Sequence, residues 1–338
     1  MQHNQNKNEI KWIVALVVSV SIVLLLTLYF FFPLLDGLIM GIVFSYVARP
    51  IKNKLEKKLG THLSSLIAMI TILIPIAFLM FYGLFQGINQ LVYVLTYQEN
   101  LEDTISQILN STKISESYIQ TILGYIPTLI EYIRNKLELL AFDIAKQFIM
   151  FIMNFFISGV VCYYALLDGG RFIRNIISII PEDKREEVEK FLNEVDETFL
   201  GLWFGNFMFA IIIGLASIPF FLYFNVPFTP LLSGLMFLAA LIPIFAEWMI
   251  LVPVTLYLAT KDLSTAIWFM LIGFLFLYFI PEIILRPYLV GYTSKIHPLV
   301  LMLAFIGGGI VGGILGFFLA PMVAGLLTAL YNYYTRRA

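Results

Sequence analysis

The sequence predicts an all-α polytopic membrane protein, with about eight transmembrane or re-entrant helices and additional amphipathic interfacial helices. Of its 338 residues, 60% are hydrophobic and 13% are charged, whereas soluble domains are about 45–50% apolar and about 25% charged. Apolar runs of roughly 20 residues, long enough to cross the hydrocarbon core as a helix, recur along the chain. The lipid bilayer is therefore the expected surrounding. The net charge of −1 gives no indication of a nucleic-acid partner.

The N-terminal region, residues 1–85, is expected to form about three membrane helices. The first apolar run is longer than the core of a signal peptide, which has about 7–15 residues, so it is expected to remain as a helix. Pro33 separates the first run from the second. The three runs are Trp12–Phe32, Leu34–Val47 and Leu63–Phe85.

Two segments outside these runs show helical spacing of their apolar residues. Residues 86–147 are expected to form an extracytoplasmic helical segment, with an apolar stripe from Ile130 to Ile144. Residues 181–200 are expected to form a cytoplasmic amphipathic helix that begins after Pro181 and runs into the next membrane helix. Either stripe serves helix packing, or it contacts a lipid or partner surface.

The C-terminal membrane domain, residues 148–338, contains five further apolar runs. Prolines interrupt several of them, and proline breaks or kinks a helix because it lacks the backbone N–H. The run with Pro243 and Pro253 is therefore expected either to span the membrane or to re-enter it. The five runs are Phe148–Leu167, Leu202–Phe224, Leu231–Leu258, Leu263–Leu285 and Leu299–Tyr331.

Lys and Arg residues in the short loops predict the orientation, because cytoplasmic loops carry an excess of both. Five of them lie between Arg49 and Lys58, which places the loop after the second expected helix in the cytoplasm. Counting spans from there places both termini in the cytoplasm, and Arg336 and Arg337 agree with this orientation. The chain is accordingly expected to be a multi-pass protein of the plasma membrane.

The last apolar run carries small residues at every fourth position. Such a step keeps them on one helix face and predicts a long shallow groove that another helix can approach closely. Helix packing alone explains this groove, and a sliding or solute-lining face is the alternative. Pro321 lies in the groove and is expected to kink the helix. The small residues are Gly308, Gly312, Gly316, Ala320, Ala324 and Thr328.

Glu247 is unusual because it lies in an apolar stretch between Pro243 and Pro253. A charge at the bilayer centre costs about 2.5–3.5 kcal/mol on insertion scales. The Glu247 carboxyl group is therefore expected to face protein or water, and to have a partner or hold a proton. A role in an ion or substrate pathway and a structural ion pair are both compatible with this position.

Glu282 and Arg286 are one helical turn apart, next to Pro281 and Pro287. Side chains at this spacing lie on the same helix face and can form an ion pair. Neutralisation of Glu247 or of an anionic solute by Arg286 is one alternative. A pair that ends a helix at the membrane interface is the other.

Motifs typical of enzymes are absent from the sequence. The three histidines, His3, His62 and His297, form no HExxH pair. There is no GxSxG motif and no Walker loop. The single cysteine, Cys162, is expected to be a small buried apolar residue. The sequence thus predicts no enzyme, no cofactor and no metal site, and any transport is expected to be driven by a gradient.

Four stretches of the C-terminal half carry a family resemblance. They are IIPEDKREEVEKFLNEVDETFLGLWFGN (Ile179–Asn206), FNVPFTPLLSGLMFLAALIPIFAEWMILVPV (Phe224–Val254), PEIILRPYLVGYTSKIHPLVLMLAFIGGG (Pro281–Gly309) and GGILGFFLAPMVAGLL (Gly312–Leu327). From about residue 160 to 330 the chain resembles the autoinducer-2 exporter-like family of permease-like membrane proteins. The resemblance implies about eight membrane segments, cytoplasmic termini, a homo-oligomer such as a pentamer, and movement of a small solute. The family usually has Gly-Pro after IPIF, where this sequence has Ala246 and Glu247.

The expected function is that of a membrane transporter or facilitator. It exports a small polar solute of the autoinducer-2 kind, or it exchanges a monovalent cation for protons. Its expected partners are the lipid bilayer, the solute or cation, and further copies of the chain. The alternative is an oligomeric membrane scaffold without transport. The expected pathway residues are Glu247, Glu282, Arg286, Pro243 and Pro253.

Overall fold

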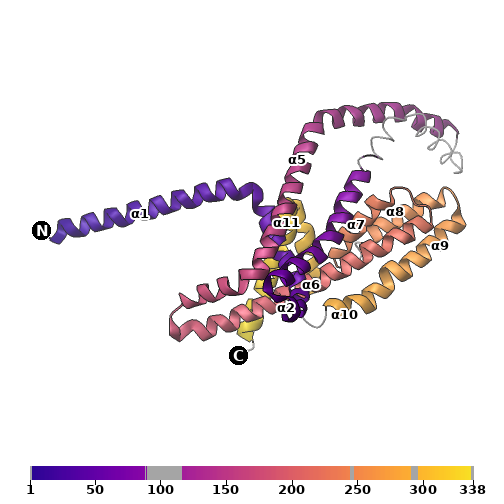
Figure 1. The fold of residues 1–338 in the computed structure, drawn as a ribbon. Coiled ribbons are helices and arrows are strands. Elements are labelled where there is room, and N and C mark those ends of the chain that lie inside the picture. Colours follow the sequence, from indigo (N-terminus) through magenta and orange to yellow (C-terminus); the bar gives the residue numbers. More distant parts are fainter. Residues whose placement is uncertain (1, 88, 90–115, 244–246, 291–295, 336–338) are drawn as a thin grey trace.

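The computed structural model describes residues 2–87, 89, 116–243, 247–290 and 296–335. Throughout these residues the regular elements are helices (Figure 1), which confirms the predicted all-α class. Among the described residues, five stretches are long and apolar enough to cross a membrane. They are Leu16–Gly87, Lys146–Ser178, Glu182–Tyr223, Leu263–Leu289 and Pro298–Thr335.

The N-terminal region begins with a helix that projects from the rest of the molecule, α1 (Figure 1). The predicted boundary at Pro33 is confirmed by a short 3-10 turn, η1. The second and third predicted helices form one element, α2, which changes direction at Gly60, where φ is 73° and only glycine is unstrained. A π-helical turn, η2, continues α2. The bounds are α1 Gln2–Phe31, η1 Phe32–Leu34, α2 Leu35–Ala77 and η2 Phe78–Tyr82.

Helix α5 (Glu116–Ser178) is 63 residues long and joins part of the predicted extracytoplasmic segment to the fourth predicted membrane helix without a break. The apolar stripe predicted from Ile130 to Ile144 lies outside the described side chains, as do residues 90–115 of that segment. The buried Asn154 fastens α5 to the start of α2. Its amide oxygen accepts from the Gly37 N–H at 2.8 Å, and its amide nitrogen donates to the Pro33 carbonyl at 2.9 Å.

Helix α6 (Glu182–Tyr223) is the central element of the bundle and packs against α2, α7, α10 and α11. It begins directly after Pro181, and the acidic Glu182 and Asp183 lie in its first turn, where their negative charges interact favourably with the helix dipole. It continues without interruption into its apolar half. The prediction that the amphipathic segment 181–200 runs into the next membrane helix is therefore confirmed.

The predicted run Leu231–Leu258 forms two short helices, α7 (Thr229–Leu241) and α8 (Trp248–Ala259). They have 13 and 12 residues. At a rise of about 1.5 Å per residue they are roughly 20 and 18 Å long, well below the hydrocarbon thickness of about 30 Å. Phe237 of α7 packs on Phe207 of α6 with 6.2 Å between ring centroids. Of the two predicted alternatives, the structure therefore shows the re-entrant one, a hairpin whose tip reaches the middle of α6.

The last helix, α11 (Pro298–Thr335), is also a hairpin. The break is at Gly313, where φ is 57° and ψ is −135°, and not at Pro321, which lies within a helical arm. The two arms touch at Gly308 and Gly316, where a Cβ on either residue would collide with the backbone of the other. The prediction of one continuous groove is therefore wrong, because the reversal at Gly313 turns the two halves of that face toward each other. The predicted face comprised Gly308, Gly312, Gly316, Ala320, Ala324 and Thr328.

Between the two hairpins the chain crosses the bundle once, as the run predicted over residues 263–285. Asp262 caps its start, since the Asp262 carboxylate accepts from the Thr265 backbone N–H at 2.7 Å. Two π-helical turns lie on either side of residue 280, next to Pro281, which removes a backbone donor there. The elements are α9 Leu263–Gly273, η3 Phe274–Phe279, η4 Pro281–Leu285 and α10 Arg286–Val290.

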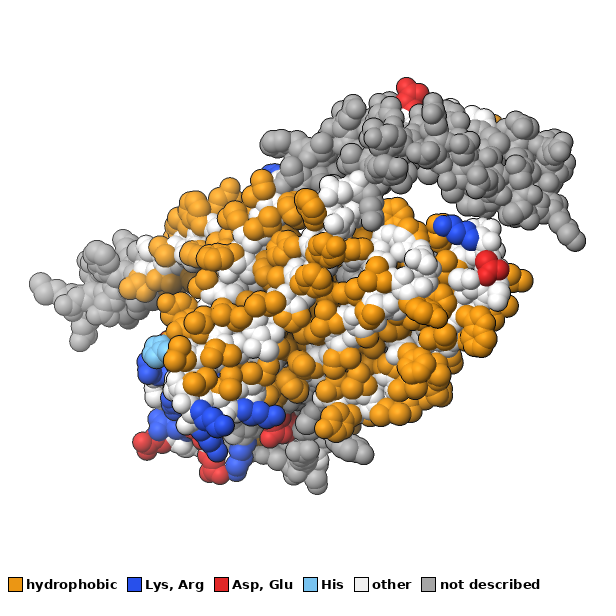
Figure 2. Space-filling model, turned by 45° about the vertical axis from the view of Figure 1, so that its right-hand side comes forward, with side chains coloured by type: hydrophobic (Ala, Val, Ile, Leu, Met, Phe, Trp, Pro, Cys, Tyr) orange, Lys and Arg blue, Asp and Glu red, His pale blue; other side chains and the backbone are white. Residues whose placement is uncertain are grey.

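The surface agrees with a membrane-spanning bundle. In Figure 2 hydrophobic side chains cover most of the visible face, and Lys and Arg side chains gather at its lower edge. Such a broad apolar surface is unfavourable in water and favourable against lipid tails.

We expect Gly313→Ala to destabilise the protein by about 1–3 kcal/mol, the usual cost of a residue held in a sparsely populated backbone region. The neighbouring Gly312→Ala is the matched control, since a Cβ at Gly312 meets no other atom within 4 Å. Thermal unfolding of the detergent-purified variants measures the difference. Equal melting temperatures would show that the reversal does not depend on Gly313.

Candidate functional site

The tips of the two hairpins converge on the middle of α6. The α7–α8 hairpin enters from the C-terminal end of α6, to which a short turn connects it. The α11 hairpin enters from the other end, where Gly325 lies close to Phe199. Near its tip, Phe318 of α11 stacks on Phe207 with 6.1 Å between ring centroids. Both hairpins thus end near Phe207, roughly halfway along the bundle.

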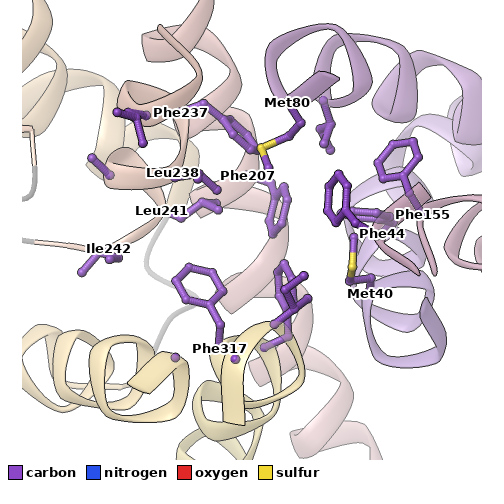
Figure 3. Close-up of a pocket in the computed structure, with 18 of the residues that line it drawn as sticks. Met40, Phe44, Met80, Phe155, Phe207, Phe237, Leu238, Leu241, Ile242 and Phe317 are labelled. Carbon is purple, nitrogen blue, oxygen red and sulfur yellow. The ribbon is translucent and has the colours of Figure 1, made fainter. Parts of the chain in front are cut away.

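A cavity of about 630 Å³ lies where the hairpins meet (Figure 3). Aromatic side chains from five helices line it, and no side chain in its described lining carries a nitrogen or oxygen atom. A polar group buried without a hydrogen-bond partner costs about 2–7 kcal/mol. The cavity is therefore suited to apolar surfaces. The aromatic wall residues include Phe44 of α2, Phe155 of α5, Phe207 of α6, Phe237 of α7 and Phe317 of α11.

Glu247 lies at the tip of the α7–α8 hairpin, immediately before α8, and is 1% exposed. Neither of its carboxylate oxygens has a hydrogen-bond partner in another described residue. The nearest opposite charge is the Arg286 Nη2 atom, 3.9 Å from Oε1. Buried charges are normally paired and hydrogen-bonded, so this carboxylate is left incompletely satisfied by the described part of the chain.

Arg286, in contrast, donates a hydrogen bond from each of its three side-chain nitrogen atoms. Its Nε donates to Glu282 at 2.7 Å, its Nη1 to the Asn206 side-chain oxygen at 3.0 Å, and its Nη2 to the Ala240 carbonyl at 3.1 Å. The guanidinium also lies 4.0 Å from the centre of the Phe209 ring, a cation–π contact. One side chain therefore joins η4, α6 and α7.

Arg286, Glu247 and Glu282 form what we call the charge cluster. With both carboxylates ionised it holds two negative charges and one positive charge. None of the three residues is part of the described lining of the cavity, and neither are their partners Asn206 and Ala240, although the adjacent Phe207 and Leu241 line it. The cluster and the cavity are thus neighbouring but separate. One proton or monovalent cation would make the cluster neutral.

The structure brings together three of the five predicted pathway residues, Glu247, Glu282 and Arg286. The predicted pair of Glu282 with Arg286 is confirmed, and Arg286 also neighbours Glu247, as one alternative required. Pro243 is buried at the hairpin tip. Pro253 lies inside α8 with an exposed side chain and belongs to neither the cluster nor the cavity lining.

Sequence reasoning missed two polar residues of this region. Asn206 binds Arg286, and the signal for it was a lone amide within an apolar run. Asp36, at the start of α2, lies close to the backbone N–H of Leu315, just after the reversal at Gly313. The tip of the α11 hairpin therefore lies beside the start of α2.

The other residues that could bind a metal or substrate have structural roles. The His297 Nδ1 atom accepts from the Leu299 backbone N–H at 3.2 Å, so His297 caps the start of α11. Cys162 is fully buried in the core, as expected for a small apolar residue. Within the part of the chain that the structure describes, no three His, Cys, Asp or Glu side chains lie close enough to hold a metal ion.

Known proteins similar to this chain are transport proteins by description. A family model for "AI-2E family transporter" matches residues 18–336. A protein of Archaeoglobus fulgidus is 56% identical over 327 residues, which is 96% of this chain and 95% of that protein. One of Methanocaldococcus jannaschii is 29% identical over 213 residues, 63% of each chain. YueF of Bacillus subtilis is 26% identical over 249 residues, 69% of this chain and 66% of its own. All three are described as a "putative transport protein".

We expect Arg286→Gln to destabilise the protein by about 3–5 kcal/mol, because removal of one partner leaves buried charges uncompensated. Addition of Glu247→Gln should restore part of this loss, since it removes one of the two excess negative charges. Thermal unfolding of the single and double variants measures both effects.

The control is Arg171→Gln, because Arg171 is a surface residue with a side chain 75% exposed. Its effect should stay within about 0.5 kcal/mol. A double variant less stable than Arg286→Gln alone would show that Glu247 does not depend on Arg286 for compensation.

Proposed function

This chain belongs to the AI-2E transporter family, and from that premise we propose that it is a gradient-driven secondary transporter that exchanges protons or a monovalent cation for its solute. Family membership and the apolar helices make it a multi-pass membrane protein. The observation that carries the proposal is the buried Glu247 carboxylate, which lacks a hydrogen-bond partner among the described residues. Ionisable residues inside a membrane protein typically mark ion pathways and proton relays.

The charge cluster supports this function through its charge count. Two carboxylates face one guanidinium, so one bound proton or monovalent cation makes the cluster neutral. Arg286 carries only N–H donors, so it cannot bind a cation or a further proton. Glu282 already accepts a hydrogen bond at 2.7 Å. Glu247 is the group left to bind the incoming ion.

The position of Glu247 supports coupling between the ion and the hairpin. Glu247 starts α8, and Arg286 also holds the Ala240 carbonyl at the end of α7. A proton or cation on Glu247 weakens the attraction between its carboxylate and Arg286. Ion binding thereby changes the contact that holds the tip of the hairpin, and this tip covers one side of the cavity (Figure 3).

The alternatives expected from the sequence have different support. Export of a small polar solute of the autoinducer-2 kind is supported by the family resemblance, whereas the charge cluster supports ion exchange. A scaffold without transport requires only the packing of the helices. It leaves the incompletely satisfied Glu247 without a role, and the absence of enzyme motifs from the sequence likewise favours transport over catalysis.

The proposal includes a plasma-membrane location with both termini in the cytoplasm, supported by the exposed Lys54, Lys57 and Lys58 near the turn at Gly60. It also includes a homo-oligomer, of which a pentamer is one form. Helix α1 supports this assembly, because its described side chains from Leu16 to Phe31 are exposed and most of them are apolar.

If α1 contributes to assembly, removal of residues 2–31 should lower the mass of the detergent-solubilised complex by more than the mass of the deleted segments. Light scattering coupled to size-exclusion chromatography measures this mass. The full chain provides the reference, and an unchanged number of copies would exclude α1 as an assembly element.

The coupling is tested with Glu247→Gln in proteoliposomes that contain a pH-sensitive dye. Addition of sodium, lithium or potassium outside should drive proton movement in the wild-type protein. We expect the rate of the variant to be at least about tenfold lower, equivalent to about 1.4 kcal/mol, because the amide cannot exchange a proton.

The matched control is Glu189→Gln, which makes the same change at an exposed position on α6. Its ion-driven rate should equal that of the wild type. If Glu247→Gln assembles and transports at the wild-type rate with unchanged pH dependence, the coupling role of Glu247 is excluded. Absence of flux from the wild-type protein with every cation would favour the scaffold.

A further inference from the structure

The cavity between the hairpin tips has a chemically uniform lining. All twenty of its described lining residues are apolar, and they include seven phenylalanines and three methionines. Its volume of about 630 Å³ lies within the range of about 300–1,000 Å³ that is usual for small-molecule sites. Such sites normally add a few polar groups that orient the ligand. This cavity has the size of a ligand site without those polar groups in its described lining.

The aromatic rings of the wall are arranged to receive another ring. Phe44 and Phe207 meet edge to face, with 5.7 Å between centroids and 84° between planes. Phe207 also meets Phe237 edge to face at 6.2 Å. In Figure 3 the rings of Phe44, Phe207 and Phe317 border the open space from three sides. Aromatic molecules extend such a ring network through offset-stacked and edge-to-face contacts, whereas a saturated chain does not.

The methionine side chains allow this wall to adapt to ligands of different shape. Met40 and Met80 come from α2 and η2, and Met249 comes from the start of α8. The methionine side chain is flexible, and its sulfur atom makes favourable contacts with aromatic rings. A wall of phenylalanines with methionines among them therefore fits aromatic molecules of several outlines.

The charge cluster does not supply polar contacts to the cavity. Arg286 donates to Asn206 and to the Ala240 carbonyl, and none of these three residues belongs to the described lining. A charged or polyhydroxylated molecule in the cavity would therefore lose its hydrogen bonds to water and find no replacement among the described side chains.

We infer that the cavity binds an uncharged aromatic molecule, which is the solute that the transporter moves. The inference rests on the proposed function for the transport step, but not for binding, which the lining alone supports. It differs from the expectation of a small polar solute, because no side chain in the described lining can form a hydrogen bond.

Binding is tested on the full chain in lipid nanodiscs with 1-bromonaphthalene, whose bromine quenches nearby tryptophan fluorescence. Trp203 is the reporter. It is fully buried, and its ring centroid lies 6.0 Å from that of Phe207 and 5.8 Å from that of Phe318, two residues of the lining. The other tryptophans, Trp12, Trp248 and Trp268, are replaced by phenylalanine. We expect saturable quenching of Trp203, reversed by naphthalene and unaffected by ribose.

The specific variant is Gly309→Leu, which fills the cavity from α11. A Cβ at Gly309 meets only the Phe317 ring, at an ordinary 3.6 Å, so the backbone accepts it. The matched control is Gly307→Leu, where a Cβ meets no other atom within 4 Å and the residue is outside the lining. Gly309→Leu should weaken binding at least about tenfold and Gly307→Leu should leave it unchanged. Gly309→Ala, which adds one carbon, should give an intermediate affinity.

Each opposite result overturns the inference. Quenching that does not saturate, or that is equal in Gly309→Leu and Gly307→Leu, would show that the probe is only dissolved in the lipid. Displacement by dodecane as strong as that by naphthalene would make the cavity a site for lipid chains, and displacement by ribose would make it a polar site. Because no ion gradient is applied, binding can succeed or fail independently of the flux lost in Glu247→Gln.

Discussion

The buried guanidinium of Arg286 is the constraint on which the arrangement of the site depends. Its side chain is 11% exposed, and a buried charge is tolerated only when it is paired and hydrogen-bonded. Its partners lie on three separate elements, since Asn206 is on α6, Ala240 on α7 and Glu282 on η4. The three elements can accept these hydrogen bonds from Arg286 together only in one relative position. That position brings the tip of the α7–α8 hairpin, with Glu247, to the middle of the bundle.

The two hairpins solve the same physical problem with opposite charges. A helix that ends inside the membrane leaves backbone groups without partners, and lipid cannot supply them. At the end of α7 the Ala240 carbonyl accepts from Arg286, and a positive charge is favourable at a helix C-terminus. At the start of the second arm of α11 the Asp36 carboxylate lies close to the Leu315 N–H, and a negative charge is favourable at an N-terminus. Interrupted helices of this kind thus require charges at the depth where they end.

Much of the fold could be predicted from local patterns. The boundaries at Pro33 and Pro181 follow from the missing N–H of proline, and the pair of Glu282 with Arg286 follows from helical spacing. The reversal in α11 could not be predicted in the same way. Five glycines between Gly307 and Gly313 permit a positive φ equally well, and only the packing of one arm on the other selects Gly313. The small residues therefore indicated close helix packing correctly. The prediction that they form one continuous helix face was wrong.

The sequence by itself determined that this protein is a membrane bundle of helices with an isolated carboxyl group at Glu247, because hydrophobicity and proline positions are properties of local sequence. The tertiary structure decided which polar groups meet. Asn206 is 80 residues from Arg286, and Asp36 is far from Leu315 in sequence. Their contacts arise from the way the hairpins enter α6 from opposite ends. The apolar cavity was decided at the same level, because its walls come from α2, α5, α6 and both hairpins, and a shared cavity depends on how distant segments pack and on no single segment.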